Sequence, residues 1–118
     1  MTQPAADARS QPRVRLSCRA LLMVGGHVLE GRTTDISEGG IGLRLRDNIP
    51  AGQLVKVQQV LPDAKGAPGT QPVIGTIRVA FNVLSTDGVR TGGPWIDLTP
   101  ASRSMVSNYV RQQMFKSP

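Results

Sequence analysis

The chain has 118 residues and a formal net charge of +6, which fits one small domain and favours anionic partners such as nucleotides, nucleic acids or phospholipid surfaces. A single cysteine, Cys18, excludes a disulfide framework or a multi-cysteine metal site within the chain, and no apolar run reaches the ~20 residues of a membrane helix. Only four residues are aromatic, too few for the row of stacking rings that single-stranded nucleic-acid readers display.

The first third of the chain predicts an arm followed by a β-hairpin. Residues 1–12 are rich in Ala, Gln, Pro and Arg and are expected to form a flexible basic arm or linker. Residues 13–24 alternate apolar and polar side chains with a period of two, which predicts a strand. Gly25-Gly26 is typical of a hairpin turn, and residues 28–34 predict the return strand.

The rest of the chain predicts four more strands and one helix. Residues 35–40, Asp-Ile-Ser-Glu-Gly-Gly, interrupt the alternation, and residues 62–72 form a long proline-containing loop. Thr99 followed by Pro100 is a helix-start signal. The further strands are predicted over residues 41–46, 54–61, 76–84 and 89–98, and one face of the helix would carry Met105, Val106, Tyr109, Val110 and Met114. The expected fold is mainly β: a six-stranded antiparallel barrel over residues 13–116 with a C-terminal α-helix.

The sequence does not favour catalysis. His27 is the only histidine and lies in a predicted turn, whereas Cys18 lies on the predicted inner face of a strand. Neither has a visible partner for a nucleophile–base pair, and the sequence contains no carboxylate pair, metal-spaced cluster or phosphate-loop consensus. We therefore expect no enzymatic activity, no catalytic residues, no metal and no resident cofactor.

Two places carry the chemistry of a binding site. A guanidinium pairs bidentately with phosphate or with a guanine edge, and four arginines gather where the arm enters the first strand: Arg9, Arg13, Arg15 and Arg19. An ordinary basic strand face has the same composition. The hexapeptide from Asp35 to Gly40 offers a carboxylate, a hydroxyl and glycines that suit a guanine edge, although a plain turn between strands prefers the same residues.

Together these two places resemble the signature of the PilZ family, which is R-x-x-x-R, then a strand and turn, then [D/N]-x-S-x-x-G. The chain matches it at residues 9–13 and 35–40. A second R-x-x-x-R frame at residues 15–19 also fits, but it lies deeper in the first strand, so we prefer the first frame. The resemblance extends over almost the whole chain, from the arm to the C-terminal helix.

The resemblance implies a barrel that binds the bacterial second messenger cyclic di-GMP and regulates a linked or partner protein, for example in exopolysaccharide or cellulose synthesis or in motility control. By this resemblance the arginines would contact phosphates and bases, the carboxylate and hydroxyl would hold a guanine, and the last glycine would keep the turn tight. The implied ligand contacts are Arg9, Arg13, Asp35, Ser37 and Gly40, with Arg15 and Trp95 as further candidates.

The implied partners are cyclic di-GMP and a linked catalytic domain or partner protein, without DNA or RNA and without membrane insertion. The implied location is the cytoplasm, either as a single-domain protein or as the cytoplasmic module of a membrane-bound synthase. Two alternatives stay open: a small basic β-barrel that binds nucleic acid, and a ligand-free PilZ-like interaction domain. The carboxylate of Asp35 would repel a phosphate backbone but suits a guanine, which favours the nucleotide ligand.

Overall fold

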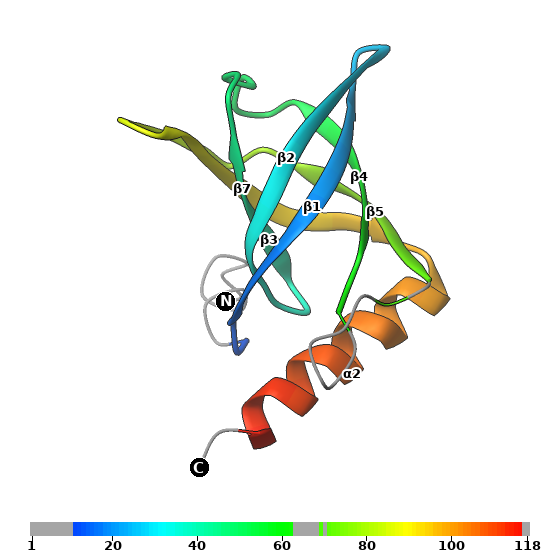
Figure 1. Ribbon diagram of the computed structural model, residues 1–118. Helices are drawn as coiled ribbons and strands as arrows, with labels where there is room; N and C mark the ends of the chain where they lie inside the picture. The colour runs from blue at the N-terminus through cyan, green and yellow to red at the C-terminus, as the bar shows by residue number, and fades with distance from the viewer. Residues whose placement is uncertain (1–10, 63–68, 70, 117–118) are drawn as a thin grey trace, which may run out of the picture.

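The computed structural model describes residues 11–62, 69 and 71–116, and these residues form seven strands and one helix. The elements are β1 (Val14–Val24), β2 (His27–Ile36), β3 (Gly40–Leu45), β4 (Leu54–Val60), β5 (Pro72–Arg78), β6 (Phe81–Ser85), β7 (Gly88–Leu98) and α2 (Pro100–Lys116). Six of the strands close into an antiparallel barrel in the order β1–β2–β3–β7–β5–β4, and β6 pairs with β7 outside this ring (Figure 1). The predicted barrel and helix are confirmed.

Barrel closure between β3 and β7 depends on glycine. Gly40 lies opposite Pro94, and Gly42 lies opposite Gly92. A Cβ placed on Gly40 would lie 2.6 Å from the carbonyl oxygen of Gly93, closer than real Cβ atoms come to other atoms. The two strands can therefore approach closely only because side chains are absent at this seam.

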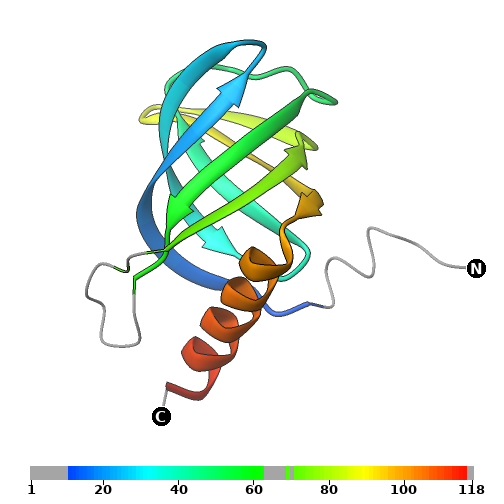
Figure 2. The same ribbon diagram turned by 90° about the vertical axis from the view of Figure 1, so that its right-hand side faces the viewer.

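Alternating side chains from the strands fill the barrel, and α2 lies across one end of it (Figure 2). Thr99 caps the helix, because its hydroxyl accepts a hydrogen bond from the backbone N–H of Ser102 (3.1 Å), which confirms the predicted helix start. Val106, Tyr109 and Val110 are buried against the barrel, whereas the predicted apolar face ends early. Met114 is half exposed and does not join the core, contrary to the sequence prediction.

The prediction of one strand over residues 76–84 was wrong. The chain instead forms β5, which begins within the predicted loop, and β6, separated by Val79 and Ala80. The backbone of Val79 exchanges hydrogen bonds with Gly52 and Gln53, and the N–H of Ala80 donates to Gly92 O (2.8 Å). These bonds insert a bulge-like irregularity that bends the strand away from β4.

Candidate functional site

Asp35 lies at the end of β2, where the pairing with β3 changes register between Thr33 and Asp35. The sequence pattern predicts a turn at Asp35, but β2 extends through Ile36, so strand geometry fixes the carboxylate. Its side chain lies over Gly42 of β3: a Cβ on Gly42 would be 2.7 Å from Asp35 Oδ2 and 3.0 Å from Oδ1. Gly42, which the sequence analysis did not identify, therefore makes room for this carboxylate.

Arg13 forms an ion pair with Asp35 at 2.9 Å between Nη1 and Oδ1. Arg13 directly precedes β1, and Arg15, within β1, is the register partner of Asp35. The antiparallel pairing of β1 with β2 therefore brings the first half of the predicted signature beside the second. The Arg13 side chain is 46% exposed and that of Asp35 is 21% exposed, so the pair faces solvent and is accessible to a ligand.

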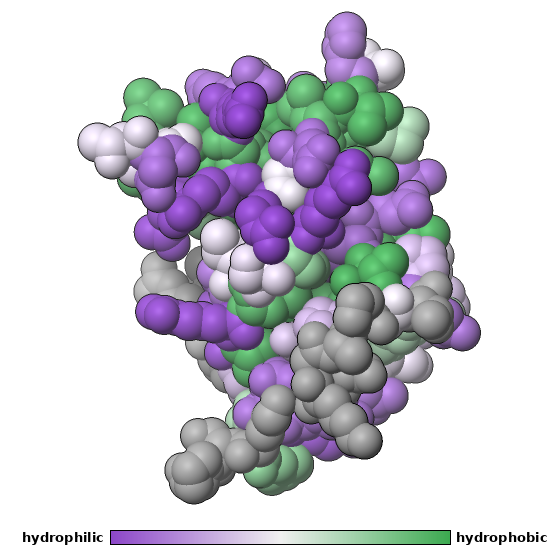
Figure 3. All heavy atoms as spheres, in the orientation of Figure 1, coloured by the Kyte–Doolittle hydropathy of each residue, from purple (hydrophilic) through white to green (hydrophobic). Residues whose placement is uncertain are grey.

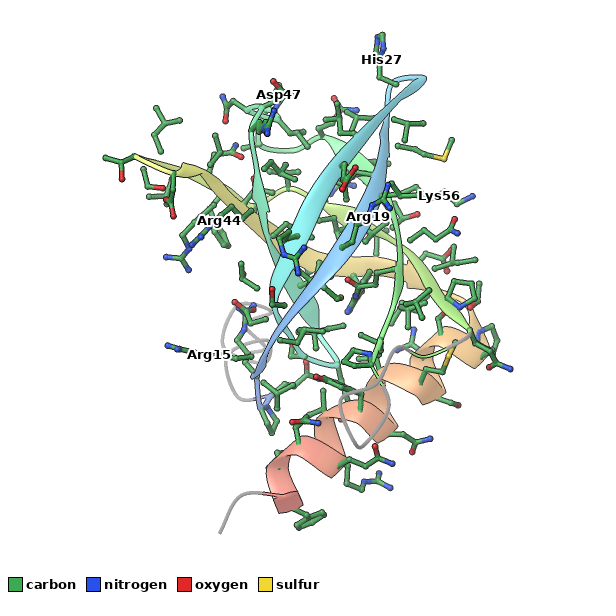
Figure 4. The ribbon with its side chains drawn as sticks, viewed as in Figure 1. Arg15, Arg19, His27, Arg44, Asp47 and Lys56 are labelled. Atoms are coloured by element: carbon green, nitrogen blue, oxygen red, sulfur yellow. The ribbon has the colours of Figure 1, made fainter. Side chains whose placement is uncertain are left out.

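A surface pocket of about 530 Å³ surrounds this ion pair. Two further arginines line it, Arg44 of β3 and Arg90 of β7, which lie directly opposite each other across the closing seam. Figure 4 shows Arg15 and Arg44 projecting outward on the same side of the barrel. The complete lining is Arg13, Val14, Arg15, Thr34, Asp35, Arg44 and Arg90, which gives four guanidinium groups around one carboxylate.

Arg44 also links the pocket to the turn between β6 and β7. Its Nη1 lies 3.0 Å from Oδ2 of Asp87, which is exposed in that turn. The Ser85 hydroxyl donates to the Asp87 carboxylate at 2.8 Å. That hydrogen bond and, secondly, the positive charge of Arg44 lower the pKa of Asp87. Arg44 therefore has an anionic partner outside the pocket.

Ser37 shapes the turn between β2 and β3. Its side chain is buried, and its Oγ accepts hydrogen bonds from the backbone N–H groups of Gly39 and Gly40, both at 3.1 Å. The Ser37 N–H also donates to Gly40 O at 2.9 Å. The hydroxyl is thus engaged in holding the turn, and a direct contact between Ser37 and a guanine stays a prediction.

Trp95 of β7 anchors the same turn from the other side of the closing seam. Its backbone N–H donates to Gly39 O at 3.0 Å, and its indole Nε1–H donates to Ser37 O at 3.2 Å. The half-buried ring also packs against the barrel core. Trp95 therefore positions the turn, and any contact of its ring with a ligand stays a prediction.

The remaining predicted site residues differ in where they fall. Arg9 lies outside the described residues. Arg19 forms an ion pair with Glu30 (2.9 Å) and does not line the pocket around Asp35, whereas Arg15 of the same frame does, so the preference for the first R-x-x-x-R frame stays a prediction. Within the described ranges, no group of three or more His, Cys, Asp or Glu residues could hold a metal ion. No helix there has the length and apolarity needed to cross a bilayer.

The fold and the pocket together define a small β-barrel with an arginine-rich surface pocket. A family model described as the PilZ domain matches residues 7–112. The chain therefore belongs to the PilZ domain family, a family of cyclic di-GMP-binding regulatory modules. No curated protein matched the sequence.

Two solved structures show the same fold. The inhibitor of motility MotI/DgrA from Bacillus subtilis aligns with a TM-score of 0.79 and 13% identity, over 92% of this chain and 52% of that one. The PilZ domain of YcgR from Escherichia coli, whose structure is with c-di-GMP, aligns with a TM-score of 0.60 and 10% identity, over 90% of this chain and 91% of that one. The chain thus spans about half the length of MotI/DgrA.

Proposed function

We propose that this PilZ domain is a receptor module for cyclic di-GMP and that it binds the messenger in the pocket around Asp35. The observation that carries the proposal is the charge of the pocket, in which four arginines surround one carboxylate. Because the pocket has more arginines than carboxylates, it favours an anionic ligand. The carboxylate calls for a ligand that also donates hydrogen bonds, as a guanine does through its N1–H and amino group.

In this proposal, contacts with the ligand replace the ion pair between Arg13 and Asp35. A guanine would donate hydrogen bonds to the carboxylate of Asp35. The guanidinium of Arg13 would then be free to pair with a phosphate of the ligand. Because both side chains are partly exposed, the pair contributes only about 0–1 kcal/mol, so its exchange costs little. Charge-assisted contacts with the ligand then exceed what is lost.

Ligand occupancy in this proposal is passed to a linked catalytic domain or a partner protein, as expected for a regulatory module acting in the cytoplasm. Displacing the Arg13 side chain from Asp35 would change the surface at the start of β1, which Arg13 directly precedes. Drawing Arg44 toward a phosphate also weakens its pair with Asp87 in the β6–β7 turn. The module itself needs no catalytic residue for this role.

Titration calorimetry tests the proposal with cyclic di-GMP, GMP and GTP as ligands. We expect cyclic di-GMP to bind with a micromolar or lower Kd, which corresponds to about −8 kcal/mol or better. GMP and GTP should bind at least roughly tenfold more weakly, since one nucleotide cannot engage both the carboxylate and the surrounding arginines. Equal affinity for GTP, or no binding of any of the three, would contradict the proposal.

Two variants and one matched control locate the site. Arg13→Ala and Asp35→Ala should each lose about 2 kcal/mol of binding free energy while the barrel stays folded. Arg19→Ala removes an arginine from the same strand region, but its ion pair with Glu30 lies outside the pocket, so affinity should stay unchanged. A loss of affinity in Arg19→Ala equal to that in Arg13→Ala would point to the other frame.

A further inference from the structure

Strand β6 leaves one edge of its backbone without a strand partner among the described residues. It pairs with β7 alone, and β7 is otherwise occupied by β3 and β5. The hairpin formed by β6 and β7 projects from the barrel as the yellow tip in Figure 1. The start of β6 is covered, because Asn82 Nδ2 donates to Ile49 O at 2.6 Å, so the free edge is its second half.

The backbone of Leu84 points toward this free edge. Ser85 and Gly88 close the two-residue turn of the hairpin, and such a closing pair is hydrogen-bonded across the two strands. Bonded and non-bonded pairs alternate along an antiparallel ladder, so Leu84, opposite Val89, falls at a non-bonded position. Its N–H and C=O therefore face away from β7 and can pair with an added strand.

The side chains on β6 are those of an interface rather than of a protected edge. Leu84 is 78% exposed and Val83 is 50% exposed, on opposite faces of the strand. Natural edge strands usually carry a charged side chain, often Lys, or a Pro that blocks pairing, and β6 has neither. Figure 3 shows apolar surface at the upper left, over the region of this hairpin, beside a hydrophilic band across the barrel strands.

The charge next to this edge selects the partner. Directly opposite residues on β2, β3, β7 and β6 form one outward row: Arg32, Arg44, Arg90 and Val83. Arg90, the arginine nearest to the edge, makes no ion pair with any residue in the described ranges. An added strand would lie about 10 Å from the Cα of Arg90, two strand spacings, a span that an extended arginine and a glutamate cover together.

We propose that the free edge of β6 is a docking site for an extended segment of a partner protein, which adds as a strand and carries acidic side chains toward Arg90 and apolar ones beside Leu84. A second copy of this chain fits less well, because each copy has a net charge of +6 and would bring its own arginine row to the same junction. Arg90 also lines the pocket around Asp35, but the pairing of the added strand with β6 itself needs no cyclic di-GMP.

The test uses amide NMR of the full chain with a capped seven-residue peptide of alternating valine and glutamate. We expect a Kd below about 1 mM, with shifts centred on residues 83–85. The Leu84 amide should exchange with solvent at least roughly tenfold more slowly when the peptide is bound. The same peptide N-methylated at its valines should not bind, because the valine opposite Leu84 then lacks the N–H that pairs with β6, while the remaining N–H groups face the other edge of the peptide.

Matched controls distinguish binding at this site from non-specific binding of the peptide. Leu84→Lys should weaken binding at least about tenfold, whereas Met23→Lys, which changes another exposed apolar residue on β1, a strand that pairs with β2 and β4 and not with β6 or β7, should not. A peptide of alternating valine and lysine should bind at least about tenfold more weakly. The proposal would be overturned by shifts centred elsewhere or by no shifts at 1 mM. Equal binding by the N-methylated or lysine peptide would also overturn it, as would dimers of the free chain in sedimentation.

Discussion

Replacing Gly42 with alanine tests whether the position of the Asp35 carboxylate determines ligand binding. The new Cβ would lie 2.7 Å from Asp35 Oδ2, and the ordinary contact range begins at 3.4 Å, so the carboxylate must retreat by about 0.7 Å. That retreat carries it away from β3 and disturbs its 2.9 Å contact with Arg13. The backbone at Gly42 needs no left-handed conformation, so alanine adds no strain of that kind.

The two measurable effects of Gly42→Ala should differ in size. Stability should fall by no more than about 1 kcal/mol, because the pair of Arg13 with Asp35 is partly exposed and the carboxylate can move. The affinity for cyclic di-GMP should fall by about 1.5–3 kcal/mol, roughly 10- to 150-fold, since hydrogen bonds to a charged group depend on its placement. Urea denaturation gives the first quantity and calorimetry gives the second.

Gly40→Ala is the matched control, because its new Cβ would lie 2.6 Å from a main-chain oxygen, that of Gly93. A main-chain oxygen cannot move without shifting β7, so this variant should lose about 1–3 kcal/mol of unfolding free energy. Wild-type affinity in Gly42→Ala, or a loss of stability as large as that of Gly40→Ala, would show that the position of the Asp35 carboxylate does not determine ligand binding.

Three further outcomes follow from the site and the barrel. Ser37→Ala should lower the free energy of unfolding by about 1–3 kcal/mol in urea denaturation, because the partly buried N–H of Gly39 and the buried N–H of Gly40 lose their acceptor. Arg90→Ala should reduce calorimetric affinity for cyclic di-GMP about tenfold or more with unchanged stability; unchanged affinity would remove Arg90 from the site. Burial raises the pKa of the Cys18 thiol, so less thiolate is present at any given pH, and iodoacetamide at pH 8 should modify it more slowly than it modifies a free thiol; a faster reaction would contradict its placement.

The parts of the fold that could be predicted are those set by local patterns. Alternation identified β1, and the Thr99-Pro100 pair identified the start of α2. The division of β5 from β6 could not be found this way. The apolar alternation in the sequence continues through Phe81 and Val83, whereas the strand is interrupted at Val79 and Ala80. The irregularity at Val79 and Ala80 reverses which residues face inward, and its hydrogen bonds come from segments far away in the sequence.

The same distinction holds for the site. Arg13 and Asp35 were predicted as a pair of binding residues because the signature contains both, and the hairpin of β1 and β2 brings them together. Arg44 and Arg90 could not be recognised, since each reads as the polar position of an ordinary alternating strand. Only the long-range pairing of β3 with β7 places them opposite each other, and only the structure shows Gly42 lying under the carboxylate.

The pairing of β3 with β7 also determines at what stage of protein synthesis the site can be completed. Trp95 holds the turn that follows Asp35, so a nascent chain that has reached Asp35 must wait for the last strand before that turn is complete. Such distant pairings form late, because the loop between them must close first. A ligand that recognised only the finished turn would act by mass action on completed molecules. It would raise the fraction that stays folded without serving as a template for folding, and chains cut short before β7 would never compete for it.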